Sequence, residues 1–413
     1  MPDDTTPPDA APAESTTPDA GPDEAGPLHI ETRAIRGGRD DNGTALAPIL
    51  WATTTFVTPT IEEGRRLATS TGESRFYSRY GNPTVNAFES AMADLEGAES
   101  ARAFASGMGA VSAVILGLCS AGDHIVAQRQ LYAGTQMLLQ AACPRFGIDV
   151  TFVDGTEPGA FAAAVRPGKT VLVFAETPAN PQLDIIDLAE VGAIAGPMTV
   201  VDSTFATPLA QRPLEYGVDL VVHSATKAIA GHNDATLGVV AGSEELLMWL
   251  WGFAILQGAN ASPFDALNGL RGLRTLGVRF ERQSATALAV AQALEAHPAV
   301  SGVRYPGLAS HPQHELAARQ MDHFGGLVAF DVSGGIEAGC RFVEGTRVAQ
   351  LATSLGGPET LVTHPASTSH VNLTPDELAA AGIGPGTVRF SAGLEHTDDV
   401  VADVLASLDA LAH

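Results

Sequence analysis

The chain has 413 residues, 45% of them hydrophobic, which is enough for a large domain with a sizeable core and a second, smaller domain. Its formal net charge of −24 argues against nucleic acid and anionic membrane surfaces as partners. The three cysteines, Cys119, Cys143 and Cys340, lie far apart without the spacing of metal ligands, so we expect neither a metal site nor a disulfide framework.

Residues 1–28 are rich in Pro, Asp, Glu, Ala, Ser and Thr and have almost nothing apolar to bury, which predicts a disordered acidic tail. From residue 29 to 75, short apolar and Thr-rich pieces alternate without a long period. The longest apolar run, Leu246–Leu256, is too short to cross a bilayer. No charged start followed by an apolar core marks a signal peptide, so we expect a cytoplasmic protein.

Two glycine- and turn-rich motifs open the next part of the chain. Tyr77–Thr84 reads YSRYGNPT, in which Asn82-Pro83 predicts a turn, and the apolar spacing after it predicts a helix over 85–96. Ser106–Ala110 reads SGMGA and precedes a helical segment over 111–118. Glycines before a helix allow backbone N–H groups to bind an anion at the positive end of the helix dipole.

Short buried segments end near residues 127, 153, 175, 202 and 223, with helices between them, and predict an α/β fold with a large, mainly parallel sheet. In such folds, ligands bind at the carboxyl ends of the strands. From residue 271 we expect a smaller α+β domain: a linking helix over 274–294, strands near 303–305, 327–331 and 387–391, and a terminal helix over 400–411. The large domain would then span residues 76–270 and the small domain 271–413.

Lys227 comes just after one of the predicted strands, in HSATK (His223–Lys227). A lysine amine must be neutral to attack an aldehyde, and the neighbouring hydroxyl groups of Ser224 and Thr226 suit a phosphate. Asp202 ends an earlier strand. Pyridoxal phosphate needs such a pair, a lysine for its aldehyde and a carboxylate for its ring nitrogen. The alternative is that Asp202 caps the next element and Lys227 is an ordinary loop residue.

Six motifs together resemble the Cys/Met metabolism family, the pyridoxal-phosphate enzymes of transsulfuration. In chain order they are YSRYGNPT (Tyr77–Thr84), ASGMGA (Ala105–Ala110), ETPANP (Glu176–Pro181), VDSTFATP (Val201–Pro208), HSATK (His223–Lys227) and VRFSAGLE (Val388–Glu395). The resemblance extends from about Ile30 to the end of the chain. It implies the fold type I architecture, pyridoxal 5'-phosphate (PLP) as cofactor and an amino-acid substrate. It also implies a homotetramer built from dimers with shared active sites, in which residues 29–75 form an arm around a neighbouring subunit.

The resemblance implies a role for each candidate residue. Lys227 would form the Schiff base and move protons, and Tyr132, also counted as catalytic, would stack on the cofactor ring. Asp202 would face the ring nitrogen, Asn180 the phenolic oxygen. The phosphate would be bound by Gly107, Met108, Ser224, Thr226 and, from the adjacent subunit, Tyr77 and Arg79. The substrate would be bound by Ser354, Asn180 and Arg389, whose planar guanidinium matches a carboxylate. Taken alone, these residues are also common in turns, on surfaces and in structural ion pairs.

A few positions that differ between branches of the family bear on the substrate. Enzymes that handle cystathionine typically carry glutamates where this chain has Phe76 and Thr353. Phe76 resembles the methionine γ-lyase branch, whereas Gly134 replaces a cysteine of that branch and resembles the homoserine-ester sulfhydrylases and γ-synthases. We expect a carbon–sulfur lyase that performs γ-elimination on methionine or homocysteine. The alternative is a transferase that performs γ-replacement on an O-acyl-homoserine. A non-catalytic pyridoxal-binding protein is a third reading, which the acid, lysine and arginine together disfavour.

Overall fold

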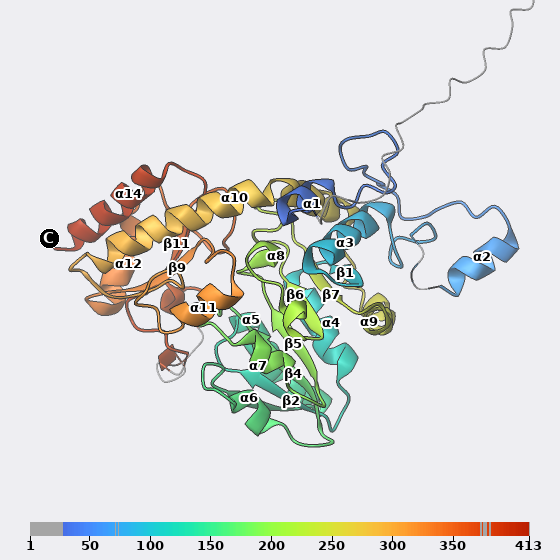
Figure 1. The fold of residues 1–413 in the computed structure, drawn as a ribbon, viewed down its shortest axis with the longest axis horizontal. Coiled ribbons are helices and arrows are strands. Elements are labelled where there is room, and N and C mark those ends of the chain that lie inside the picture. Colours follow the sequence, from blue (N-terminus) through green and yellow to red (C-terminus); the bar gives the residue numbers. More distant parts are fainter. Residues whose placement is uncertain are drawn as a thin grey trace, which may run out of the picture.

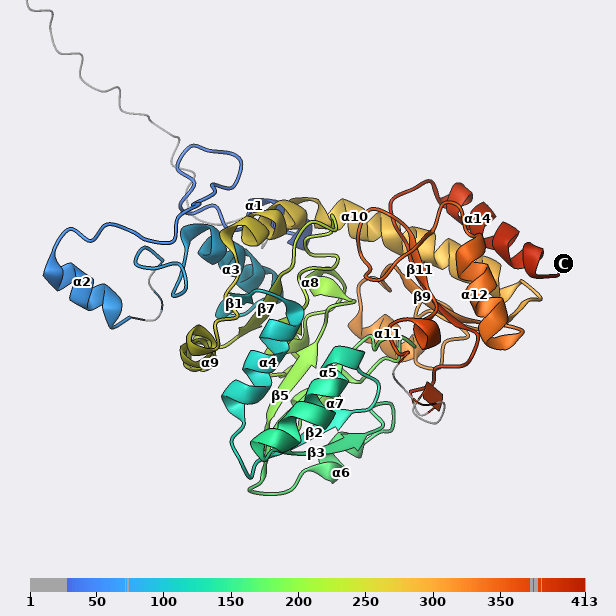
Figure 2. The same cartoon turned by 180° about the vertical axis from the view of Figure 1, so that it is seen from behind.

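The structure is a computed structural model that describes residues 28–412, apart from residues 71, 73, 372, 373, 375–377 and 380. The predicted acidic tail, except Leu28, therefore lies outside the described residues. The described strands form two sheets, and the long helix α10 (Pro263–Glu295) passes alongside both (Figures 1 and 2).

The larger sheet has seven described strands in the order β1-β7-β6-β5-β4-β2-β3. The strands are β1 (Ser100–Phe104), β2 (His124–Gln128), β3 (Asp149–Val153), β4 (Thr170–Glu176), β5 (Met198–Asp202), β6 (Leu220–His223) and β7 (Gly238–Gly242). All pairs from β6 to β3 are parallel, while β7 is antiparallel to both of its neighbours. The predicted α/β fold with a mainly parallel sheet is confirmed. The sequence predicted β2 to β6 and missed β1 and β7.

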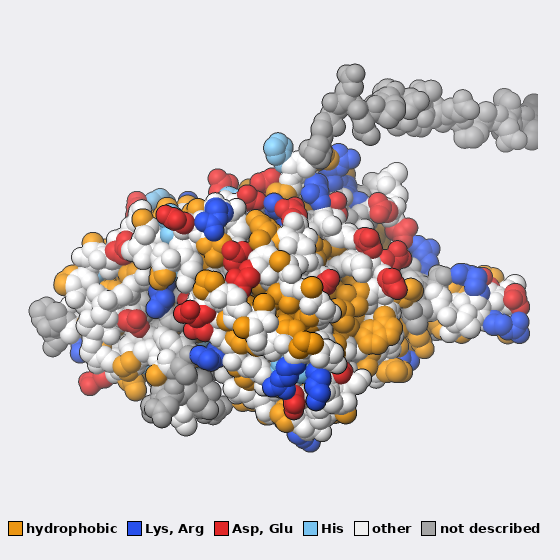
Figure 3. Space-filling view, turned by 60° about the horizontal axis from the view of Figure 1, so that its bottom comes forward, with side chains coloured by type: hydrophobic (Ala, Val, Ile, Leu, Met, Phe, Trp, Pro, Cys, Tyr) orange, Lys and Arg blue, Asp and Glu red, His pale blue; other side chains and the backbone are white. Residues whose placement is uncertain are grey.

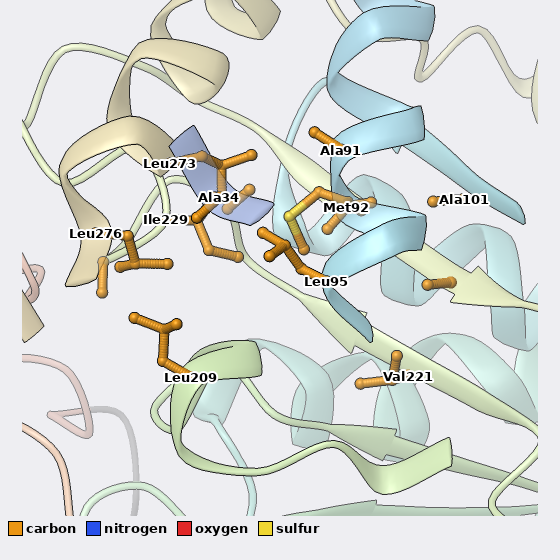
Figure 4. Packing of buried hydrophobic residues seen from close by; sticks show 14 of the residues in the cluster. Ala34, Ala91, Met92, Leu95, Ala101, Leu209, Val221, Ile229, Leu273 and Leu276 are labelled. Carbon is orange, nitrogen blue, oxygen red and sulfur yellow. The ribbon is translucent and has the colours of Figure 1, made fainter. Parts of the chain in front are cut away.

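Helices cover both faces of this sheet, so its central strands are buried on both sides. In β6, Val221 packs with the helices on one face and Val222 with those on the other. The first face carries α1 (Ile30–Arg36), α3 (Pro83–Glu96), α6 (Ala160–Ala164), α7 (Leu188–Gly192), α8 (Thr207–Ala210) and the first half of α10. The second carries α4 (Gly107–Leu118), α5 (Ala133–Met137) and α9 (Glu244–Gln257). Figure 4 shows the first core, where Met92 and Leu95 of α3 face Leu273 of α10.

The smaller sheet has five described strands in the order β10-β11-β12-β9-β8. The strands are β8 (Val300–Arg304), β9 (Leu327–Val332), β10 (Gln350–Leu351), β11 (Leu361–Thr363) and β12 (Thr387–Ser391). The helices beside it are α11 (His314–Gln320), α12 (Gly335–Gly345) and α14 (Thr397–Asp409). The predicted strands near 303, 327 and 387 are therefore present, whereas β10 and β11 were not predicted.

Helix α10 begins earlier than the sequence predicted. Ser262 caps it by accepting a hydrogen bond from the N–H of Phe264, and Pro263 occupies its first turn, where a missing N–H has no cost. The predicted boundary after residue 270 consequently falls inside this helix, and the division of the chain into the predicted domains stays a prediction.

The segment around α2 (Ile61–Ala68) projects from the body (Figure 1). Two of its apolar side chains are largely exposed, Val57 at 94% and Ile61 at 84%, whereas Leu67 is buried. Figure 3 shows further hydrophobic side chains gathered on the face of the body beside this segment. Among the described residues, no helix combines the length and apolar character needed to cross a membrane. The cytoplasmic location stays a prediction.

Candidate active site

A cavity of about 560 Å³ opens at the carboxyl ends of β4, β5 and β6 and is lined by residues from around both sheets. Its position agrees with the rule that ligands bind at strand ends in open α/β sheets. Ten of the twelve predicted site residues line it: Gly107, Met108, Tyr132, Asn180, Asp202, Ser224, Thr226, Lys227, Ser354 and Arg389. Tyr77 and Arg79 are not among the lining residues.

Lys227 reaches into this cavity from the turn that follows β6. The turn is closed by a hydrogen bond from the N–H of Lys227 to the carbonyl of Ser224, and the lysine Nζ donates to the hydroxyl of Ser354 over 2.9 Å. Burial and the positive charge of Arg389 lower the pKa of Lys227 to about 8. At neutral pH, a larger fraction of this amine is therefore neutral and nucleophilic than in an exposed lysine.

Ser354 has an unusual backbone conformation, with φ at +83°. A non-glycine residue in this region is strained, and such strain persists only where the surroundings impose it. Here its carbonyl accepts a hydrogen bond from Nη2 of Arg389 over 3.0 Å, while its hydroxyl accepts from Lys227. The strained residue thus connects the predicted Schiff-base lysine with the predicted substrate-binding arginine.

Arg389 lies in the middle of β12 and is only 7% exposed. Besides Ser354, it donates from Nη1 to Oδ1 of Asn180 over 3.2 Å. No carboxylate forms an ion pair with it among the described residues, and burial lowers the pKa of Arg389 to about 10. A buried guanidinium without a counter-ion is a strong binding site for an incoming carboxylate. Because Asn180 accepts with its oxygen, its Nδ2 is left to donate to a ligand.

Asp202 ends β5 in register with Glu176, the last residue of β4. Its Oδ1 accepts hydrogen bonds from the N–H and the hydroxyl of Thr204, at 3.0 and 2.5 Å. Burial raises the pKa of Asp202, while the bonds from Thr204 and the nearby His223 oppose the rise. The hydrogen bonds recorded for its carboxylate leave Oδ2 free to pair with a protonated ring nitrogen.

The start of α4 approaches the turn before Lys227 very closely. A Cβ on Gly107 would lie 2.6 Å from the Cβ of Ser224, so only glycine fits there. Ser106 caps the helix through the N–H of Gly109, and Ala110 is the first residue to donate within the helix. The N–H groups of Gly107 and Met108 are therefore available to an anion, beside the Ser224 hydroxyl.

Thr226 is less available than the sequence predicted. Its hydroxyl donates to the carbonyl of Leu237 over 3.1 Å and accepts from the N–H of the same residue over 2.8 Å. These bonds fix the turn that carries Lys227 against the strand β7. Thr226 lines the cavity, but it must give up its bond to the Leu237 carbonyl before it can donate to a phosphate.

Tyr132 stands at the rim of the cavity, just before α5, with its side chain 46% exposed. Its backbone N–H donates to Oε2 of Glu176 over 2.8 Å. The neighbouring Gly134 has no side chain to interfere: a Cβ there would lie 2.5 Å from Cε1 of Tyr132 and 3.1 Å from Sδ of Met108. The position of the ring therefore depends on the glycine as well as on Glu176.

Arg279 and Gln283 on α10 also contact the loops of this site, and the sequence assigned them no role. Arg279 is buried and donates to the carbonyls of Ala228 and Ile229, directly after Lys227, at 2.8 and 3.4 Å. Gln283 donates to the carbonyl of Gly357 over 2.8 Å, in the loop that follows Ser354. Their spacing on a helical segment was visible in the sequence, but their burial and their partners were not.

Tyr77 and Arg79 lie outside the cavity lining, in the segment between α2 and α3. Arg79 donates to the carbonyl of Ile255 over 3.2 Å, and its guanidinium lies 5.0 Å from the ring centroid of Tyr80. Tyr77 is 42% exposed. Within one chain, these two residues therefore do not complete the site.

A family model described as "Cys/Met metabolism PLP-dependent enzyme" matches residues 31–409. The chain belongs to this family. L-methionine gamma-lyase of Porphyromonas gingivalis is 45% identical over 387 residues, which cover 92% of this chain and 97% of the relative. O-succinylhomoserine sulfhydrylase of Pseudomonas aeruginosa is 42% identical over 390 residues, with 92% and 96% covered.

Solved structures agree with this assignment. A cystathionine gamma synthase from Xanthomonas oryzae pv. oryzae, in complex with aminoacrylate and cysteine, matches with a TM-score of 0.88 at 38% identity. The match covers 94% of this chain and 99% of that chain. The fold type I architecture is thereby confirmed, and so is the assignment as a PLP-dependent enzyme of transsulfuration, a lyase or a γ-replacement transferase.

The cavity fits the cofactor of this Cys/Met metabolism enzyme. Its lining combines a lysine of lowered pKa, an aspartate with a free carboxylate oxygen, and helix N–H groups beside a serine hydroxyl. When bound, PLP withdraws electrons from the substrate's Cα and so allows its proton and, later, a γ-substituent to leave. The roles assigned to the individual lining residues stay predictions, and the geometry of the cavity is consistent with them.

Proposed function

We propose that this enzyme performs γ-elimination on a sulfur amino acid with a short, uncharged γ-substituent, methionine or homocysteine. Water is consumed, and the products are 2-oxobutanoate, ammonia and a thiol from methionine, or hydrogen sulfide from homocysteine. In this proposal the Nζ of Lys227 takes the proton from Cα and returns it at neighbouring positions. Arg389 binds the α-carboxylate with its two guanidinium nitrogens, and the Nδ2 of Asn180 faces the phenolic oxygen of the cofactor.

One observation supports this substrate choice above the others. Among the described residues, the only carboxylates that line the cavity are Glu176 and Asp202. Glu176 accepts from two backbone N–H groups, while Asp202 accepts from Thr204 with one oxygen and, in this proposal, pairs with the cofactor's ring nitrogen through the other. A cystathionine molecule would bring a second ammonium group into this cavity without a carboxylate to receive it. Leaving a charge without a partner costs several kcal/mol, whereas a thioether methyl or a thiol carries no such cost.

A second candidate, γ-replacement on an O-acyl-homoserine, is favoured by Gly134. A glycine here resembles the sulfhydrylase and γ-synthase branches, and the Tyr132 ring packs against it so closely that a Cβ would lie 2.5 Å from Cε1 of that ring. In this reaction a small nucleophile such as sulfide adds to Cγ after the acyloxy group has left as a carboxylate. The relatives include members of both kinds, an L-methionine gamma-lyase and an O-succinylhomoserine sulfhydrylase.

The two candidates are separated by one set of assays on the purified enzyme. Release of 2-oxobutanoate is measured from L-methionine, L-homocysteine, L-cystathionine and O-acetyl-homoserine, each with and without sulfide. Elimination predicts 2-oxobutanoate from methionine or homocysteine, independent of sulfide. Replacement predicts that sulfide suppresses 2-oxobutanoate from the ester and yields homocysteine instead.

We further propose that the enzyme is a homotetramer of dimers in which two subunits complete each active site. Tyr77 and Arg79 lie outside the cavity of their own chain, which supports this proposal. Both residues are then available to bind the cofactor phosphate in the cavity of a neighbouring subunit. The exposed apolar side chains of the projecting segment, among them Val57 and Ile61, support the expectation that this segment packs on another subunit. Light scattering at several protein concentrations tests the assembly, and a monomer would contradict it.

A further inference from the structure

Glu176 connects the two loops that carry the predicted contacts to the cofactor ring. Its Oε2 accepts the backbone N–H of Tyr132 over 2.8 Å, and its Oε1 accepts the backbone N–H of Asn180 over 2.9 Å. The side chain is buried, with 4% exposed. Tyr132 comes from the segment after β2 and Asn180 from the segment after β4, so one carboxylate fixes two separate parts of the cavity lining.

The backbone of Glu176 is itself fixed by a neighbouring strand. Its N–H donates to Oε1 of Gln128, and its carbonyl accepts from Nε2 of the same side chain, both over 2.9 Å. Gln128 ends β2, four residues before Tyr132. Gln128 of β2 therefore fixes the backbone of Glu176. The carboxylate of Glu176 in turn fixes the segment after β2, in which Tyr132 lies.

Glu176 and Asp202 end adjacent strands in register, yet their hydrogen bonds give them different functions. Asp202 keeps one oxygen free, whereas both oxygens of Glu176 are occupied by backbone N–H groups. Only an acceptor with two equivalent oxygens can serve both N–H groups. A glutamine at this position would point its NH2 group at one of them and leave that backbone donor unpaired in a buried place.

We propose that Glu176 is a positioning residue, whose carboxylate aligns the ring of Tyr132 with a face of the bound cofactor and the side chain of Asn180 with its edge. The proposal rests on the cofactor roles of Tyr132 and Asn180. Both roles then depend on Glu176, although Asp202 is the predicted partner of the cofactor's ring nitrogen. Since Asn180 also accepts from Arg389, a change at Glu176 reaches the substrate carboxylate site through Asn180.

The test uses Glu176→Gln and Glu176→Asp in the holoenzyme, with Glu89→Gln as matched control. Glu89 is also a buried glutamate that accepts a backbone N–H, from Ala103 over 2.8 Å, but it does not line the cavity. The readouts are the dissociation constant for PLP, the circular dichroism of the visible cofactor band, and the melting temperature. Glu176→Asp keeps the charge but is one methylene shorter, so it reaches one N–H group and is expected to fall between wild type and Glu176→Gln.

We expect Glu176→Gln to raise the dissociation constant for PLP by about tenfold or more, the size expected when a buried backbone N–H group is left without an acceptor. The cofactor's circular dichroism should weaken at the same time. Glu89→Gln should lower the melting temperature without changing either cofactor signal. If the two variants change the cofactor signals equally, or if Glu176→Gln lowers only the melting temperature, Glu176 is merely structural and the proposal is wrong.

Double-mutant cycles show whether Glu176 acts through the residues it holds. In a Tyr132→Ala or an Asn180→Ala background, Glu176→Gln should cost less cofactor affinity than it does in the wild type. Strictly additive effects overturn the proposal. If Tyr132→Ala and Asn180→Ala alone leave the cofactor signals unchanged, the roles assigned to these two residues fail, and the positioning role fails with them. If they matter while Glu176→Gln does not, only the positioning role fails.

Discussion

The Nζ of Lys227 and the hydroxyl of Ser354 lie 2.9 Å apart, although 127 residues separate them in the chain. The first belongs to the loop after β6 of the large sheet, the second to the loop between β10 and β11 of the small one. This hydrogen bond makes the reactive amine part of a network that continues through the Ser354 carbonyl to Arg389 and on to Asn180. Hydrogen bonds therefore connect the predicted Schiff-base lysine with the residues predicted to bind the substrate.

Lys227→Ala should abolish covalent attachment of PLP and nearly all turnover while the protein stays folded. The change removes the one lysine that lines the described cavity and leaves a small void at a half-buried position. The visible band of the bound cofactor, the assay of 2-oxobutanoate and the melting temperature check this. Full activity in this variant would refute the assignment of the lysine.

The rate of PLP capture by the cofactor-free enzyme should depend on pH in a way that reports Lys227. Burial and the charge of Arg389 lower the pKa of Lys227 from 10.5 to about 8. Because the neutral amine is the nucleophile, the rate should rise with pH through about 8 and level off above it. Arg389→Gln removes a nearby positive charge, so the pKa of Lys227 should rise and the midpoint should move to higher pH.

Arg282→Gln is the control for this pH measurement. Arg282 is an exposed arginine of α10 that donates to the carbonyl of Glu395, and it does not line the cavity. Its replacement should leave the midpoint where it is. A midpoint near that of free lysine in the wild type, or one that Arg389→Gln does not move, would contradict the electrostatic account.

Arg79→Ala should weaken cofactor retention in the assembled enzyme, because the phosphate loses a charge-assisted partner worth about 1.5–3 kcal/mol. If Arg79 serves the neighbouring subunit, mixing this variant with Lys227→Ala should restore activity in some sites, since one site of a hybrid then has both residues intact. Activity is measured after mixing and reassembly, with each variant alone as reference. Hybrids that form but stay inactive would speak against shared sites.

Gly134→Cys should reduce cofactor affinity and turnover, by about tenfold or more, because an added Cβ meets the Tyr132 ring at 2.5 Å and overpacking costs about 1–3 kcal/mol. Gln136→Ala, on the same short helix and outside the cavity lining, is the control and should have little effect. The same variant tests the choice between reactions. If Gly134 serves γ-replacement, as its resemblance to the sulfhydrylase and γ-synthase branches suggests, sulfide-dependent replacement should fall more than elimination does.

Substrate choice should respond to charge at Thr353, an exposed residue of the cavity lining. In the wild type, kcat/KM for methionine, homocysteine or an O-acyl-homoserine should exceed that for cystathionine by at least about tenfold, or ~1.4 kcal/mol of discrimination. Thr353→Glu should move the ratio toward cystathionine, whereas Thr353→Gln should not. Steady-state kinetics decide this, and cystathionine as the best wild-type substrate would show that the pocket had been misread.

The parallel core of the large sheet could be predicted because each of its strands is a short apolar run followed by polar residues. The strands β1 and β7 were missed since SARAF and GVVAG carry charge or glycine in place of a clear apolar run. Both are defined by pairing with each other, across more than 130 residues of chain, which a local pattern does not contain. The two-residue strand β10 was likewise too short to leave a pattern.

The candidate site could be predicted from motifs to a large extent, because the chemistry of PLP demands particular residue types. Ten of the predicted residues meet in one cavity. Glu176 belongs to a motif that was identified, but no role followed from it, because the N–H groups it accepts are backbone groups of Tyr132 and Asn180. The hydrogen bond from the Thr226 hydroxyl to Leu237 could not be predicted either, because its acceptor is a backbone carbonyl.

Helix α10 has a consequence for the dimensions of the active site. Arg279 binds the loop after Lys227, and Gln283 binds the loop after Ser354. Four residues apart on a helix, the two side chains leave the same face about one turn, or ~5.4–6 Å, from each other. The spacing between the loop after Lys227 and the loop after Ser354 is therefore set by the pitch of one helix. A one-residue insertion between 279 and 283 would rotate one anchor by about 100° away from its loop while leaving every lining residue unchanged.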